Sequence, residues 1–139
     1  MRRYLLDTGP LAAYLHGRPG AVQLIAPWIR QRAAATSILV YAEVHEYLQG
    51  LSDYPRRREQ LRRLMREIPP YTLTYPALER YGDLRRQLRP PHGPGIIGDV
   101  DTLTAAAALT RDLTVVTTDA DYQRVAGLRV QVLPRVSLR

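Results

Sequence analysis

The chain of 139 residues contains no cysteine, lysine, asparagine or phenylalanine. Without cysteine it has neither a disulfide framework nor a thiolate zinc site. The missing lysine excludes P-loop NTPases, Schiff-base enzymes and receiver-type phosphoacceptor domains, because each of these needs a lysine ammonium group. No apolar stretch is long enough to cross a bilayer, and no signal-peptide core follows Arg2 and Arg3. We therefore expect a cytoplasmic protein without a membrane partner.

The charges that are present are strongly one-sided. All 20 basic residues are arginine, against 13 acidic residues, which gives a net charge of +7. Arginine binds phosphate bidentately, so an arginine-only surface suits RNA or DNA. The length predicts a single domain over residues 1–139, large enough to bury roughly two thirds of its unfolded surface.

Short apolar or β-branched runs alternate with helical patterns along the whole chain. We predict strands at Tyr4–Leu6, Ala33–Thr36, Tyr71–Tyr75, Thr114–Thr117 and Val130–Leu133. We predict helices at Leu11–Leu15, Ala21–Arg32, Ile38–Gln49, Pro55–Ile68, Ala77–Leu88, Asp99–Leu109 and Ala120–Val125. This alternation predicts an α/β fold with a parallel sheet and helices on both faces. Ligands of such sheets lie beyond the carboxyl ends of the strands.

Four acidic residues stand out because each lies in its own apolar segment: Asp7, Glu43, Asp101 and Asp119. Carboxylates beside apolar segments are costly unless their charge is compensated. If the fold gathers them, they repel one another and raise each other's pKa. A divalent cation relieves this repulsion, and Mg²⁺ and Mn²⁺ prefer oxygen ligands. An acidic metal site on a basic chain indicates an enzyme that cuts a polyanion.

Each of these acids also has a structural alternative. Asp7 follows a strand and can cap the next helix. Glu43 can be a partly exposed helix residue, as we expect for Glu46 on the same face. Asp99 and Asp101 both begin an Ala-rich helix, so one is expected to cap it and the other to face the metal. Of the two, Asp101 is the preferred ligand.

The segment after the fourth predicted strand holds further candidates. A turn-forming aspartate is common after a strand, which is the alternative for Asp119 or Asp121. Thr117 is placed to hydrogen-bond a ligand carboxylate, although a threonine at a strand end also reflects plain β-propensity.

Four short patterns in order carry a resemblance to a known family: strand-Asp-Thr, helical Ala-Glu-Val, Asp-x-Leu-x-Ala-Ala and Val-Thr-x-Asp-x-Asp-aromatic. Together they resemble the PIN-domain nucleases, and most of all the VapC toxins of toxin–antitoxin pairs. The likeness runs from Tyr4 to Val132. It implies a three-layer α/β/α fold with a parallel sheet of about five strands. It also implies catalytic and metal-binding roles for Asp7, Glu43, Asp101 and Asp119, with Thr117 and Asp121 as secondary candidates. Asp99 departs from the family pattern as an extra acid near Asp101, and it is a further secondary candidate.

The function implied by this resemblance is metal-assisted hydrolysis of RNA phosphodiester bonds, with Mg²⁺ or Mn²⁺ as cofactor. It further implies a homodimer and inhibition by a cognate antitoxin protein. Two alternatives remain open: a PIN-domain nuclease of RNA processing without an antitoxin, and a non-catalytic RNA-binding scaffold. Four retained acids argue against the scaffold.

The predicted helix Pro55–Ile68 carries six arginines and two glutamates. Arg56, Arg57 and Arg58 form a run at its start, and we predict that they contact RNA phosphates. The alternative for this run is an ordinary solvated helix face.

Overall fold

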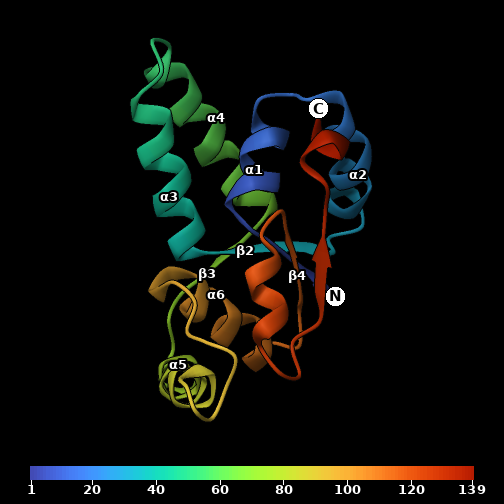
Figure 1. The fold of residues 1–139 in the computed structure, drawn as a ribbon. Helices are drawn as coiled ribbons and strands as arrows, with labels where there is room; N and C mark the ends of the chain where they lie inside the picture. Colours follow the sequence, from blue (N-terminus) through green and yellow to red (C-terminus); the bar gives the residue numbers. More distant parts are fainter.

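The protein folds around one sheet of five parallel strands, in the order β3-β2-β1-β4-β5 (Figure 1). The computed structural model describes residues 1–139. The strands are β1 (Tyr4–Leu6), β2 (Ala34–Ser37), β3 (Pro70–Tyr71), β4 (Thr114–Thr117) and β5 (Val130–Val132). The predicted α/β fold with a parallel sheet of about five strands is therefore confirmed.

Six α-helices and two short 3₁₀ helices connect and follow these strands. The α-helices are α1 (Thr8–Leu15), α2 (Pro19–Arg30), α3 (Ile38–Gln49), α4 (Tyr54–Glu67), α5 (Tyr75–Leu88) and α6 (Asp99–Thr110). The 3₁₀ helices are η1 (Ala120–Arg124) and η2 (Arg135–Leu138). None of the helices combines the length and apolar character that a membrane span requires.

Neighbouring residues of each central strand pack into two separate cores. Leu6 and Val116 belong to a core shared with α1 to α4, whereas Leu5 and Val115 belong to a core shared with α5, α6 and η1. This alternation follows from the period of two in a β-strand, which sends successive side chains to opposite faces. The sheet is thus covered on both faces, which makes three layers.

The connection from β2 to α3 shows how the sequence sets an element boundary. Ser37 ends β2 and is the N-cap of α3, where its Oγ accepts a hydrogen bond of 3.0 Å from the Leu39 N–H. A serine in this position satisfies a helix N–H that has no partner within the helix. The predicted helix Ile38–Gln49 and its serine cap are both confirmed.

The third strand was the least accurate prediction. It covers Pro70–Tyr71 alone. Of the residues predicted to extend it, Thr72–Thr74 belong to no strand and Tyr75 starts α5. Thr74 caps that helix by accepting a hydrogen bond from the Ala77 N–H at 3.3 Å, and Pro76 occupies its first turn, where proline is favoured. The alternating pattern that predicted a strand overlaps the capping residue Thr74, and the segment begins a helix instead.

The loop from Gly93 to Gly98 has the G-x-G-x-x-G spacing of dinucleotide-binding sites. That pattern binds pyrophosphate only where a strand precedes it, and here the preceding element is α5. Gly93 is required for packing instead, since a Cβ at this position would lie 2.0 Å from the Gln87 carbonyl oxygen. The loop therefore has no indication of nucleotide binding.

Candidate active site

Asp7 lies directly after β1 and is buried, with 8% of its surface exposed. Thr117 Oγ1 donates a hydrogen bond of 2.7 Å to its Oδ2, and the Tyr122 hydroxyl oxygen lies 3.3 Å from its Oδ1. Asp7 occupies the N-cap position of α1 but its side chain makes no capping hydrogen bond. Burial raises the pKa of Asp7, and the nearby Glu43 carboxylate adds to this, while the hydrogen bond from Thr117 opposes it.

Asp101 lies in the first turn of α6 and approaches the same Tyr122 hydroxyl as Asp7 does. Its Oδ1 accepts a hydrogen bond of 3.0 Å from the Tyr122 hydroxyl. Burial raises the pKa of Asp101, and Asp7, Asp119 and Asp121 raise it further by charge repulsion. The hydroxyl of Tyr122 therefore lies between the carboxylates of Asp7 and Asp101.

The structure separates Asp99 from Asp101. Asp99 forms an ion pair with Arg85 and accepts a hydrogen bond of 3.2 Å from the Tyr81 hydroxyl, and 68% of its side chain is exposed. The prediction that one of the pair caps α6 is wrong, because Gly98 is the N-cap and no side chain caps this helix end. Residues two apart point in different directions on a helix, and here Asp101 is the one that faces Asp7.

Glu43 reaches the site from the middle of α3. Its Oε1 accepts a hydrogen bond of 2.7 Å from Thr8 Oγ1, which ties α3 to the first residue of α1. The side chain is half-buried, whereas Glu46 is exposed. Because Thr8 directly follows Asp7, this bond brings the Glu43 carboxylate close to Asp7, and it contributes to the raised pKa of Asp7.

Asp119 follows β4 and begins η1. Its Oδ1 accepts a hydrogen bond of 2.9 Å from the Asp121 N–H, so this aspartate does form the turn expected of such a residue. Its own N–H donates to Thr117 Oγ1 at 3.0 Å. Asp121 pairs instead with Arg124 at 3.4 Å. One carboxylate oxygen of Asp119 remains without a hydrogen bond in the chain.

Thr117 joins two of the acids through one hydroxyl. It donates to Asp7 Oδ2 and accepts from the Asp119 N–H, and its side chain is fully buried. Since a donor and an acceptor are both used, the hydroxyl is fixed in orientation. It therefore also fixes the Asp7 carboxylate.

Tyr122 is the residue that sequence reasoning missed. The pattern Val-Thr-x-Asp-x-Asp-aromatic counted it only as an aromatic side chain, yet it is fully buried with its hydroxyl between two acids. A buried tyrosine usually finds a hydrogen-bond partner, and this was the available signal. Nearby on α6, the buried hydroxyl of Thr104 has no hydrogen-bond partner in the chain.

The donor set fits a hard divalent cation by its chemistry. All four candidate ligands are carboxylates. Burial raises the pKa of Asp7 and of Asp101, and repulsion from the neighbouring carboxylates raises both further. Oxygen-only sites with excess negative charge are those that Mg²⁺ and Mn²⁺ occupy. The carboxylates are near one another but not assembled, since no three acidic or histidine side chains are arranged to hold one ion.

The arginine run at the start of α4 is partly neutralised. Arg56 and Arg57 both bond to Asp53, at 2.9 and 3.0 Å, and Arg58 lies over the Tyr54 ring at 5.6 Å. The hydrogen bond from Arg56 holds the pKa of the Asp53 carboxyl below its usual range. That this run contacts RNA stays a prediction. Because Asp53 pairs with Arg56 and Arg57, the run carries less unpaired positive charge than the sequence suggests.

Comparison with known proteins agrees with this geometry. The PIN domain family matches residues 4–128. A comparison with curated proteins gives no match. Among solved structures, a chain of VapBC2 from Rickettsia felis bound to a promoter DNA fragment has a TM-score of 0.80 and 20% identity, over 94% of this chain and 98% of that one. A chain of DNA-bound VapBC from Salmonella typhimurium has a TM-score of 0.81 and 18% identity, with coverages of 95% and 98%. A chain of VapBC-1 from nontypeable Haemophilus influenzae has a TM-score of 0.77 and 22% identity, over 93% of this chain and 96% of that one. At these identities the likeness shows the fold.

Proposed function

The chain belongs to the PIN-domain family, and we propose that it is a metal-dependent endoribonuclease of the VapC type. PIN domains are generally nucleases, and the fold is that of chains in VapBC complexes. The observation that carries the proposal is the pair of carboxylates on Asp7 and Asp101. They lie on either side of one hydroxyl at the carboxyl edge of the sheet.

In this proposal Asp7, Glu43, Asp101 and Asp119 hold one or two Mg²⁺ or Mn²⁺ ions. When bound, such an ion supplies Lewis-acid assistance to the hydrolysis of the phosphodiester bond. Thr117 orients Asp7, and Thr8 orients Glu43. Asp99 is left out of the ligand set because its charge is already paired with Arg85.

The proposed protein partner is an antitoxin whose C-terminal segment packs on α1 and α3. These helices carry Asp7 at the start of one and Glu43 within the other, and they contact each other. Ile38 and Tyr47 of α3 are exposed apolar side chains, at 37% and 49%. A basic residue of the segment would replace the charge of a cation at Asp7 and Glu43. A homodimer also belongs to the proposal, as does a single nuclease domain over residues 1–139.

A cleavage assay on a mixed RNA pool tests this function. The purified protein is expected to cut RNA in Mg²⁺ or Mn²⁺ and to stop when EDTA removes the ion. Inactivity in both metals, from protein that is folded by circular dichroism, would favour the non-catalytic scaffold. Cleavage without a co-purifying product of the neighbouring reading frame would favour a nuclease of RNA processing.

A further inference from the structure

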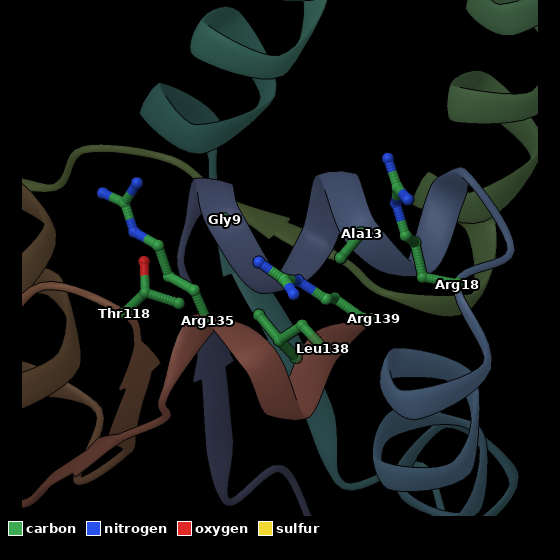
Figure 2. A pocket seen from close by; sticks show the side chains of 7 residues that line it. All are labelled: Gly9, Ala13, Arg18, Thr118, Arg135, Leu138 and Arg139. Carbon is green, nitrogen blue, oxygen red and sulfur yellow. The ribbon is translucent and has the colours of Figure 1, made fainter.

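A cavity of about 310 Å³ lies beside the acidic site, between α1 and the C-terminal residues (Figure 2). Three arginines line it: Arg18, which precedes α2, and Arg135 and Arg139, which lie at the beginning of η2 and just after it. No acidic residue is part of its lining. Positive charge from two separate segments of the chain thus lines one cavity.

The three guanidinium groups are all free. Within the chain none of them takes part in a hydrogen bond or an ion pair, and all three side chains are exposed. The six ion pairs of the chain use arginines of α4, α5, η1 and the loop before β5 instead. Like charges placed together repel one another, and an anion in the cavity would relieve that repulsion.

Close packing of the chain end holds this arrangement. Gly20 donates a backbone hydrogen bond of 2.8 Å to the Arg139 carbonyl oxygen, and a Cβ at Gly20 would lie 2.3 Å from the Ser137 carbonyl oxygen. Leu138 is buried beside the cavity, with 6% of its surface exposed. The glycine therefore allows the approach that brings Arg139 near Arg18.

The cavity shares a wall with the acidic site. Gly9 and Thr118 line it, and they stand two residues after Asp7 and directly before Asp119. The two meet, because a Cβ at Gly9 would lie 3.1 Å from Thr118 Oγ1. A cluster of carboxylates and a cluster of free arginines therefore lie on neighbouring parts of one surface.

We propose that this cavity binds a backbone phosphate of the single RNA strand whose neighbouring phosphodiester lies at the acids, an inference that rests on the proposed function. Arginine donates to phosphate oxygens in a planar, bidentate geometry. A strand with regularly spaced phosphates places one group at the acids and another at the arginines. No aromatic side chain lines the cavity, so a base would find no stacking partner there. Phosphate contacts of this kind fix the register of the strand without reading its sequence.

The test compares two triple variants with the same change in net charge. The pocket variant carries Arg18→Gln, Arg135→Gln and Arg139→Gln. The control carries Arg80→Gln, Arg86→Gln and Arg89→Gln, in and just after α5, where the three side chains are exposed and unpaired. α5 lies at the opposite end of the molecule from α1 and the C-terminus (Figure 1). If the pocket variant does not fold, the single variants Arg18→Gln and Arg135→Gln take its place.

The probe is a fluorescein-labelled, mixed-sequence single-stranded RNA of about 12 nucleotides, titrated by anisotropy in EDTA over a range of salt. We expect the pocket variant to bind roughly tenfold more weakly than the control, with a salt slope lower by about 0.7 units because one phosphate contact is lost. Equal affinity and equal slope in the two variants would overturn the proposal. Displacement of the RNA by polyglutamate at equal charge would also overturn it, because the cavity would then recognise an acidic protein segment.

Cleavage in Mn²⁺, measured in parallel, separates this inference from the function on which it rests. The pocket variant should show a raised KM with little change in kcat. If the wild type fails to cut but the pocket variant still loses binding, the nuclease proposal fails and the phosphate site stands. If the wild type cuts and both variants share one KM, the phosphate site fails and the nuclease proposal stands.

Discussion

Replacing Tyr122 with phenylalanine removes one hydroxyl and leaves the buried ring in place. That hydroxyl is the sole side-chain donor to Asp101, at 3.0 Å, whereas Asp7 keeps its hydrogen bond from Thr117. A hydrogen bond to a charged group contributes about 1.5–3 kcal/mol to stability. We expect Tyr122→Phe to destabilise the metal-free protein at neutral pH by about 2 kcal/mol.

The sensitivity of this loss to metal is what distinguishes the account from a simple packing defect. A divalent ion compensates the carboxylates directly, so saturating Mn²⁺ should reduce the loss to well under half. Urea unfolding with and without Mn²⁺ measures both values. The control is Tyr81→Phe, which removes a hydroxyl that bonds to the exposed Asp99 and should cost no more than about 0.5 kcal/mol. An identical loss for Tyr122→Phe with and without Mn²⁺ would refute the reasoning.

Three further predictions follow from the same site and its surroundings. Because the pKa of Asp7 is raised above 3.8, the folded state binds more protons than the unfolded state just above that pH, and stability falls as the pH rises through the folded pKa. Metal-free Asp7→Asn should therefore be more stable than the wild type at pH 7, with the difference vanishing toward pH 4 in urea unfolding; a constant difference would contradict this. Changing Arg56, Arg57 and Arg58 to glutamine should weaken RNA binding and lower the slope of log affinity against log salt by at most about one unit per lost contact. The total should be less than about three units, because Asp53 already pairs with two of the arginines. An unchanged slope would make α4 an ordinary solvated helix. Co-expression with the neighbouring reading frame should yield a stable complex without nuclease activity, as judged by size-exclusion chromatography and RNA cleavage; harmless expression of the native chain alone would contradict the toxin.

Most of the fold follows from local signals that do not compete. Short runs rich in apolar or β-branched residues became β1, β2, β4 and β5, and α3 has its predicted bounds because Ser37 caps it and Gly50 is its C-cap. The strand predicted at Tyr71–Tyr75 exists but is too long, because its alternating pattern overlaps the capping threonine of α5.

The sequence indicates which acidic residues are candidates for the site, but it does not indicate how their side chains are oriented. Which of Asp99 and Asp101 faces inward depends on Arg85 and Tyr81 of a different helix, and no local pattern contains that information. The role of the Tyr122 hydroxyl depends on two acids that lie 115 and 21 residues away along the chain. The arginine cavity depends in the same way on residues from both ends of the chain.

The most direct test of the account compares Asp101→Asn with Asp99→Asn. The two residues lie two positions apart in one helix, carry the same charge and differ in which way they face. The measurement is the rate of RNA cleavage as Mn²⁺ is titrated, with folding checked by circular dichroism. We predict that Asp101→Asn loses at least about a hundredfold in rate, since loss of a residue that merely supports a metal ligand already costs about 10–100-fold, while Asp99→Asn stays within a factor of about three. Equal activity in the two variants, or a greater loss in Asp99→Asn, would contradict the central claim that Asp101 belongs to the catalytic metal site.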